Sequence, residues 1–342
     1  MKALKFSILI LLILLVSINA NAAKISKKVY KSFPVNSVQK MAINNKYGNI
    51  YIENNRTDSV IVSVDIWVEG NSEKARRLLN NINVSINQSG SSVSAITSIE
   101  SMNNNNNEFS IDYNIAVPVD RDLDIIQKYG TVNMKDLTGK GNFEIKYGEL
   151  NAQKLISPDL ALDIAYSKVN IESVKDLSLV LRYSKLRLDK GNNLKFETRY
   201  SGIAVENCNQ LEADSKYDNY NIQNVNTLVL NSMYTGTKVD KLNTKLNLVN
   251  GYGGFTVKVI PAGFESINIE NKYAGIKLGV ASDASYQLSG KGHYCNIDHP
   301  EGKLNTTRQN FSYEVTGTVG KTESPKSSIQ INSSYGNVGL TQ

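Results

Sequence analysis

A tyrosine recurs every 17 or 18 residues through the middle of the chain, each time inside the same apolar frame. Three consecutive units have the sequences LALDIAYSKVNI, LSLVLRYSKLRL and LKFETRYSGIAV. A short fixed period is typical of repeat proteins, in which each unit is stabilised by its neighbours. The tyrosines of the clearest units are Tyr166, Tyr183, Tyr200, Tyr217, Tyr234 and Tyr252.

Apolar and polar residues alternate within each unit. Leu177, Leu179 and Leu181 share one parity, and Leu186 and Leu188 have the other. A period of two residues is typical of strands with one buried face. The parity changes beside the tyrosine, at pairs such as Ser-Lys, Ser-Gly and Gly-Gly, which favour turns and bulges. Each tyrosine is therefore predicted to lie at a corner between two strands.

A unit of this length holds two or three short strands, which cannot enclose a core by themselves. Successive units must therefore stack, with their strands about 4.8 Å apart and their apolar side chains buried over one another. The sequence predicts an all-β, single-chain β-solenoid, expected to be a right-handed β-helix, with coils of about 17 to 21 residues. The same stacking would align the tyrosines in a ladder, at a spacing that suits aromatic pairs.

Two interpretations of this ladder are open. Because Tyr183 has the parity of Leu177 to Leu181, the rings could face the core or cap the corner, and their role would then be structural. Alternatively, the corner could turn the side chains outward, and the tyrosines would form an exposed surface on which a sugar or a peptide stacks. Parity alone favours the inward orientation.

Residues 1–22 have the organisation of a secretory signal peptide. Lys2 and Lys5 precede an apolar segment at 8–16, and residues 20–22, Ala-Asn-Ala, form a small-x-small cleavage site. The apolar segment is too short for a stable transmembrane helix. We expect an exported protein of the periplasm, the outer-membrane surface or the medium. The formal net charge of +6, or +4 without the two lysines, is spread along the chain and does not indicate nucleic-acid binding.

Residues 23–125 are expected to form a less regular N-terminal portion of the solenoid, and residues 126–342 its regular, tyrosine-marked portion. One N-terminal segment has helical rather than strand spacing, with apolar residues at Ala75, Leu78, Leu79 and Ile82. Ser72 is a suitable N-cap and Glu73 suits the first turn. This helix, predicted at 72–82, either covers the open end of the solenoid, where unpaired strands would invite aggregation, or is an insertion on its side.

Tyrosines continue the series on both sides of the clearest units, and the spacing reaches 21 residues near Tyr294. The next one, Tyr335, follows after 41 residues, about twice the repeat. A degenerate coil around Phe311–Val315 is expected to fill this gap, and residues 318–327 are expected to form a surface loop.

The chain has two cysteines, Cys208 and Cys295, and export would permit a disulfide. The repeat places them five coils apart, about 24 Å at 4.8 Å per coil, whereas a disulfide needs Cα atoms within about 7 Å. We therefore expect Cys208 to be a small buried apolar residue and Cys295 to be a free thiol.

Candidate residues for chemistry are few. The two histidines fall in one segment with a thiol and a carboxylate, a weak candidate metal cluster whose spacing matches no known motif. Its members are His293, Cys295, Asp298 and His299. With both histidines there, a Ser-His-Asp arrangement has little chance of forming elsewhere. Outward carboxylates occur at differing phases of the repeat, and no glycine-rich phosphate loop opens a helix. No enzyme activity, metal or cofactor is predicted.

Several segments resemble a known family. The exported start, NKYGNI at 45–50, VP at 117–118 before LDIIQKYG at 123–130, and the tyrosine-marked coils resemble the bacterial putative-adhesin family of secreted β-solenoid proteins. The resemblance implies an envelope or secreted protein of Gram-negative bacteria. It implies no catalytic residue, because the family has no established activity.

Three functions follow as hypotheses. The first is an exported, non-enzymatic binding or scaffold protein that presents a solenoid face to a glycan or an envelope protein. The second is a structural envelope protein that polymerises end to end, which uncapped solenoid ends would favour. The third, which we favour least, is a polysaccharide-cleaving β-helix enzyme, which predicts acidic and basic side chains converging on one lateral groove. The ligand and the oligomeric state do not follow from the sequence.

Overall fold

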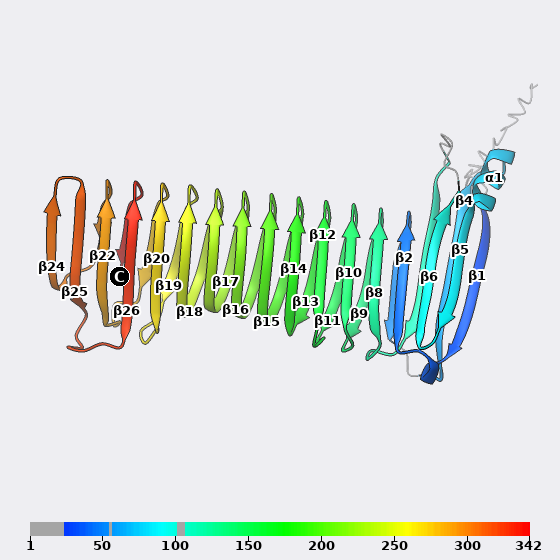
Figure 1. Cartoon of the computed structure of the whole chain (residues 1–342), viewed down its shortest axis with the longest axis horizontal. Helices are drawn as coiled ribbons and strands as arrows, with labels where there is room; N and C mark the ends of the chain where they lie inside the picture. The colour runs from blue at the N-terminus through cyan, green and yellow to red at the C-terminus, as the bar shows by residue number, and fades with distance from the viewer. Residues whose placement is uncertain (1–23, 55–56, 101–106) are drawn as a thin grey trace, which may run out of the picture.

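The computed structural model describes residues 24–54, 57–100 and 107–342, and the predicted signal peptide lies outside these ranges. The described chain forms 27 strands and one α-helix, and no described helix has the length and apolar character needed to cross a membrane. The strands form one long sheet that does not close into a barrel. Figure 1 shows an elongated stack of coils with irregular elements at both ends. The prediction of an all-β protein is confirmed.

Each coil consists of a strand that ends just before a tyrosine and a strand that begins just after it. For example, β14 (Asp176–Arg182) ends before Tyr183, and β15 (Lys185–Arg199) begins after Ser184. Strands of the first kind pair in parallel with each other, and so do strands of the second kind. Two faces result, which we call the leading face and the trailing face.

The leading face contains β2 (Lys40–Lys46), β8 (Asp122–Lys128), β10 (Gly141–Lys146), β12 (Leu160–Ala165), β14, β20 (Ser266–Lys272), β22 (Tyr286–His293) and β26 (Ser327–Ser334). The trailing face contains β3 (Ile50–Asn54), β9 (Thr131–Leu137), β11 (Glu149–Leu155), β13 (Lys168–Val174), β19 (Phe255–Ile260), β21 (Ile276–Val280), β23 (Ile297–Asp298) and β27 (Val338–Thr341). Four long strands bend and contribute to both faces: β15, β16 (Gly202–Lys216), β17 (Asn219–Met233) and β18 (Gly236–Gly251).

The core lies between the two faces and is built from aligned rows of apolar side chains. Leu162, Leu179 and Phe196 occupy one register on consecutive coils, and all three are buried. Because the register is maintained from coil to coil, each buried side chain covers its counterpart on the next coil. Burying a side chain of this size contributes about 1.5–3 kcal/mol. This aligned packing explains why the sequence repeats with so little variation in length.

Antiparallel strands cover the N-terminal end of the stack. They are β1 (Lys24–Pro34), β4 (Ser59–Glu69), β5 (Ile82–Ser89), β6 (Ser92–Ile99) and β7 (Phe109–Val117). β6 pairs with β2 on the leading face, β7 pairs with β3 on the trailing face, and a short 3₁₀ turn, Val35–Ser37, follows β1. β5 and β6 form an antiparallel hairpin whose turn contains Gly90.

The predicted helix is confirmed as α1 (Glu73–Asn81), with the Ser72 side chain accepting a hydrogen bond from the Ala75 amide at 3.2 Å. Leu78 and Leu79 are buried. α1 lies at the N-terminal end of the molecule beside β4 and β5 (Figure 1). The strands of this end, more than the helix, cover the coils. The division of the chain near residue 125 stays a prediction, as does the right hand of the winding.

The C-terminal end differs from the expected order of coils. β26 lies between β20 and β22, so the last coil of the sequence is inserted before the coil of Tyr294. The gap before Tyr335 is not filled by a degenerate coil, so that prediction is wrong. Instead, β24 (Gly302–Gln309) and β25 (Ser312–Val319) form an antiparallel hairpin that covers the end of the stack next to β22. The hairpin turn contains Phe311, and residues 320–326 link β25 to β26 outside any strand.

Both cysteines are free, as predicted. They lie six coils apart and not the predicted five, because the coil of Tyr335 is inserted between those of Tyr273 and Tyr294. Cys208 is buried in the core. Cys295 is partly exposed, and its thiol donates to the Ser333 carbonyl at 3.3 Å.

Gly130 follows the corner residue Tyr129, at a point where two coils approach closely. A Cβ atom on Gly130 would lie 1.7 Å from the carbonyl oxygen of Gly48. We expect Gly130→Ala to lower the free energy of unfolding by about 3 kcal/mol, because the coils must separate to accept the methyl group. Gly254→Ala is the control, since its Cβ meets nothing within 4 Å, and it should change stability by less than about 0.5 kcal/mol. Equal midpoints for the two variants in equilibrium urea unfolding would contradict the close approach.

Burial raises the pKa of the Cys208 thiol to about 12. The thiol therefore stays protonated at about pH 8.5 in the folded protein, and the reactive thiolate is absent. We expect iodoacetamide to add one label per folded chain, at Cys295, and two labels in urea, as measured by intact-protein mass spectrometry. Two labels on the folded protein would show that the core around Cys208 opens readily.

Candidate functional site

Every corner tyrosine has a left-handed backbone conformation. The six predicted site residues and six further tyrosines have φ between +51° and +64°. The further tyrosines are Tyr47, Tyr129, Tyr147, Tyr273, Tyr294 and Tyr335. For a residue with a side chain this conformation costs about 1–2 kcal/mol, and glycine or asparagine adopts it more readily. The backbone preference of tyrosine therefore does not explain why it occurs at these corners, whereas the contacts of its side chain can.

Hydrogen bonds to the neighbouring coil hold each corner in place. The Tyr183 amide donates to the Arg199 carbonyl of the next coil at 3.0 Å. The next amide, of Ser184, donates to the Ser201 hydroxyl at 3.2 Å, and the Ser184 hydroxyl donates to the Arg182 carbonyl at 2.7 Å. The same pattern recurs at Tyr166 with Ser167, so the ladder of hydrogen bonds continues through the turn.

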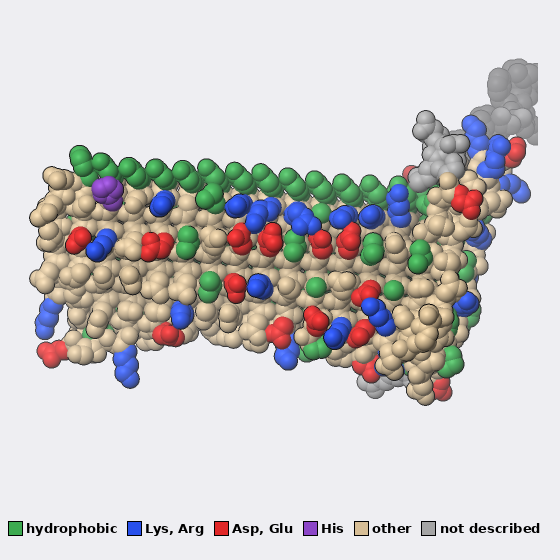
Figure 2. Space-filling view, in the orientation of Figure 1, with side chains coloured by type: hydrophobic (Ala, Val, Ile, Leu, Met, Phe, Trp, Pro, Cys, Tyr) green, Lys and Arg blue, Asp and Glu red, His purple; other side chains and the backbone are tan. Residues whose placement is uncertain are grey.

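The twelve rings form one continuous stack along the molecule. Neighbouring ring centroids are 4.8–5.1 Å apart, and the ring planes are within 11° of parallel. Phe109 contacts the ring at one end, Tyr47, and Phe311 stacks on the ring at the other end, Tyr294. We call these twelve tyrosines the tyrosine ridge. Figure 2 shows the ridge as an unbroken apolar row along one edge of the molecule.

The inward orientation predicted for the rings is wrong. Eleven of the twelve ring-bearing side chains, all except Tyr47, are 44–51% exposed. The left-handed corner turns the side chain out of the alternation that places Leu177 and Leu181 in the core. Since each ring covers the faces of its neighbours, the ridge exposes ring edges and phenol hydroxyls. The flat faces on which a sugar would stack are used within the ridge itself.

A row of cations runs beside the ridge. The residue before the tyrosine is Lys or Arg in seven of the twelve coils, and these positions are aligned by the strand register of the leading face. The seven are Lys46, Lys128, Lys146, Arg182, Arg199, Lys216 and Lys272. Figure 2 shows this basic row directly below the ridge, with an acidic row next to it. The signal is visible in the sequence as a recurring Lys or Arg directly before the tyrosine, although the sequence-based prediction of the site named only the tyrosines.

Acidic neighbours neutralise part of this row. Arg182 forms an ion pair with Asp163 at 2.5 Å, and Arg199 forms one with Asp214 at 2.9 Å. The hydrogen bond between Lys146 and Glu144 raises the pKa of the lysine and lowers that of the carboxyl. Within the described ranges, the other four cations have no carboxylate within ion-pair distance. The flank of the ridge therefore carries a net positive charge.

The candidate metal cluster does not converge on one point. His293 lies near the Ser312 hydroxyl, 3.3 Å from Nδ1, and its ring packs on the edge of Tyr294. His299 Nε2 is 2.9 Å from the Tyr313 hydroxyl, on the hairpin side. Among the described residues no three His, Cys, Asp or Glu side chains are placed to share a metal ion. The members of this candidate cluster, which are close to each other in the sequence, are His293, Cys295, Asp298 and His299.

Comparison with known proteins finds similar solved structures. A "putative cell adhesion protein" from Clostridium sporogenes is 10% identical, with 93% of this chain and 99% of that chain covered and a TM-score of 0.21. A "putative adhesin" from Parabacteroides distasonis is 7% identical, with 92% and 97% covered and a TM-score of 0.33. A "putative lipid binding protein" from the same species is 10% identical, with 92% and 97% covered and a TM-score of 0.28.

No family model and no curated protein matches the sequence. The TM-scores of these solved structures are all below 0.5. Four of the similar solved structures have names that match the family resemblance drawn from the repeat, putative adhesin or putative cell adhesion protein.

Proposed function

We propose that this chain is an exported, non-enzymatic binding protein that lays its tyrosine ridge along an elongated partner of the cell envelope. The observation that carries the proposal is the exposed stack itself. Twelve corners adopt a left-handed conformation that asparagine or glycine would adopt at lower cost, and every one keeps an aromatic side chain. Stacking stabilises the fold by about 0.5–1.5 kcal/mol per pair of rings, which is similar to the cost of the left-handed conformation. The stability of the fold alone therefore does not explain why tyrosine occupies these corners.

The shape of the ridge limits the kind of partner. Eleven steps of about 4.9 Å make it about 54 Å long, straight and one residue wide. Ring edges and hydroxyls offer apolar contact together with hydrogen bonds, as tyrosines do at protein interfaces. The cationic flank favours a partner that carries negative charge beside its apolar surface. An extended envelope protein or an anionic envelope polymer has both properties.

The alternative of end-to-end assembly has less support. Antiparallel strands cover both ends, whereas assembly in register needs open parallel coils. At the N-terminal end, Lys27 Nζ donates to the Ile82 carbonyl at 2.6 Å, and Lys31 Nζ donates to the Ile86 carbonyl at 2.5 Å. At the other end, the outermost strand β24 is polar and exposed. These are features by which proteins discourage pairing at sheet edges.

The ridge is tested with three substitutions at once, Tyr183→Asn, Tyr200→Asn and Tyr217→Asn. Asparagine tolerates the left-handed conformation, so the coils should keep their fold while the middle of the ridge is removed. We expect binding to envelopes of the producing cells, measured by co-sedimentation, to weaken by about tenfold or more. Raising the salt concentration should also weaken wild-type binding, because the cationic flank is exposed.

Tyr30→Asn is the matched control, since Tyr30 is 58% exposed on β1 but lies outside the ridge. This variant should bind as the wild type does. If the triple variant stays folded and keeps full envelope binding, the ridge is not the recognition surface. If the wild type does not sediment with envelopes at any salt concentration, the proposed function is wrong.

A further inference from the structure

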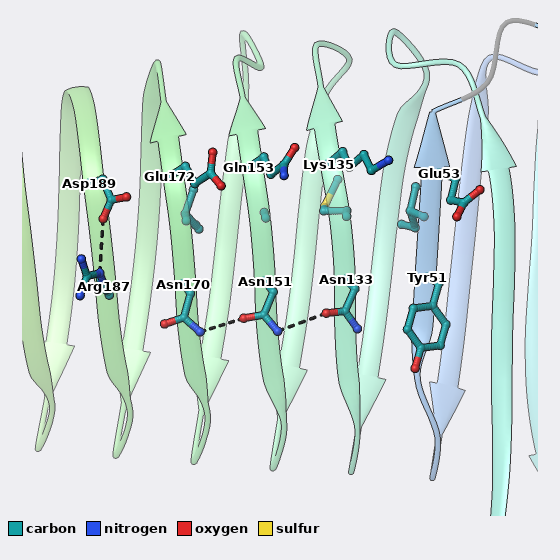
Figure 3. A pocket seen from close by; sticks show the side chains of 14 residues that line it. Tyr51, Glu53, Asn133, Lys135, Asn151, Gln153, Asn170, Glu172, Arg187 and Asp189 are labelled. Atoms are coloured by element: carbon teal, nitrogen blue, oxygen red, sulfur yellow. Dashed lines mark hydrogen bonds and ion pairs between the residues drawn. The ribbon is translucent and has the colours of Figure 1, made fainter.

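A second surface, on the trailing face and away from the ridge, has the features of a ligand site. A groove of about 410 Å³ crosses five consecutive coils, over β3, β9, β11, β13 and β15 (Figure 3). Its two walls are rows of outward side chains that stand two residues apart on each strand. Backbone and buried side chains such as Met134 and Ile171 form the floor between them.

The first wall is a ladder of side-chain amides with an aromatic ring at one end. Asn151 Nδ2 donates to Asn133 Oδ1 at 3.2 Å, and Asn170 Nδ2 donates to Asn151 Oδ1 at 2.8 Å. Strand pairing places Tyr51 in register with Asn133, and Arg187 in register with Asn170. Figure 3 shows the three amides in line between Tyr51 and Arg187.

The amide ladder leaves hydrogen-bonding capacity unused. Each amide has two N–H donors and two acceptor lone pairs, and a place in the ladder uses only one or two of the four, although Asn170 Nδ2 also donates to Glu149 Oε1 at 2.8 Å. Asn133 and Asn151 are half-buried, so their remaining groups face the groove at fixed positions. Fixed donors and acceptors alternating along a line suit a ligand that carries hydroxyl groups at regular intervals.

The ring of Tyr51 is not stacked on another described ring, in contrast to the rings of the tyrosine ridge. It is 41% exposed and stacks on no other ring among the described residues. A free aromatic face beside a row of polar groups is a suitable surface for the apolar face of a sugar ring.

The charges on the second wall indicate which kind of ligand the groove accepts. It contains Glu53, Lys135, Gln153, Glu172 and Asp189, and Asp189 forms an ion pair with Arg187 of the first wall at 3.4 Å. The groove as a whole has three carboxylates and two cations, so its charge is nearly balanced. A polyanion would meet the carboxylates unfavourably, whereas an uncharged chain would meet donors and acceptors along the whole groove.

From these observations we infer that the groove binds an uncharged polysaccharide chain along the coil axis. Five coils span about 19 Å at 4.8 Å per coil, and one coil advances by close to the length that one sugar ring adds to an extended chain. The site therefore holds about four rings, one of them on Tyr51. The inference rests on the proposed role as a binding protein, but it does not depend on the ridge.

The groove contains the acidic and basic side chains that a polysaccharide-cleaving enzyme would need, yet their setting favours binding. Glu53 and Glu172 are exposed to solvent. A catalytic carboxylic acid needs burial or a close carboxylate to raise its pKa. Asp189 forms its ion pair with a cation, Arg187, and not with a second carboxylate.

Isothermal titration with cellohexaose, xylohexaose and chitohexaose tests the inference, with hexagalacturonate as the charged comparison. We expect at least one uncharged hexamer to bind. In a series of shorter oligomers of the same sugar, affinity should rise up to about four rings and then level off. Replacing Asn133, Asn151 and Asn170 together by Ala should weaken binding by about tenfold or more. Tyr51→Ala should have a similar effect, and Tyr51→Phe should leave binding intact because the ring face remains.

A second amide ladder serves as the matched control. Asn209, Asn226 and Asn243 are linked in the same way, at 2.9 Å and 3.0 Å, outside the groove. Their replacement by Ala should leave sugar binding unchanged. If the groove triple variant fails to fold, the Tyr51→Ala and Tyr51→Phe pair decides the result.

Four outcomes would overturn the inference. These are no binding of any uncharged hexamer at millimolar concentration, tighter binding of hexagalacturonate, equal loss of affinity in the control ladder variant, and the appearance of shorter sugars with time. The last outcome would make the groove catalytic. The triple ridge variant should bind the sugars normally. A defect confined to envelope binding would therefore concern the ridge and not the groove.

Discussion

The parallel hydrogen bonds between successive coils are the interaction on which the rest of this structure depends. They fix each coil at the strand spacing from its neighbours and in a register that carries through the corner, where the Tyr183 amide still donates to the next coil. Once the register is fixed, every position in the repeat becomes a row of side chains along the axis. The core, the ridge and the amide ladders are all consequences of this one constraint.

In a row of equivalent side chains along the axis, each side chain is covered or oriented by the next. In the ridge, each tyrosine is covered on both faces by its neighbours, so an aromatic surface forms without a hydrophobic core around it. In the groove, each amide is oriented by the next one, so polar groups on a solvent-exposed face are held at regular positions. A solenoid therefore presents long, repetitive surfaces, which suit partners that are themselves long or repetitive.

The two ends show how such a stack is stopped. Parallel coils have no natural last member, because each leaves unpaired groups for another. This chain changes to antiparallel pairing at both ends, through β1 and β4 to β7 at one and the β24–β25 hairpin at the other. At the C-terminal end the final coil is also placed inside the stack, between β20 and β22. Phe109 and Phe311 cover the two open faces of the ridge in the same regions.

The sequence alone was sufficient to predict the repeat, the strand alternation, the corner position of each tyrosine, helix α1 and the lack of a disulfide, because these depend on local pattern and on a large separation along the stack. It could not determine which way the tyrosines point. The alternation of Leu177, Leu179 and Leu181 predicts an inward Tyr183. The left-handed backbone conformation of Tyr183 turns the ring outward instead, and the alternation of apolar residues does not reveal that conformation.

The order of the last coils and the position of the groove depend on contacts between distant parts of the chain. The position of β26 before β22 results from pairing between strands that are far apart in the sequence. The groove combines Tyr51 with Asn133, Asn151 and Asn170, and the described elements between Tyr51 and Asn133, β4 to β8, belong to the N-terminal end and the next coil. Residues that are distant in sequence become neighbours in a row only when the coils are stacked.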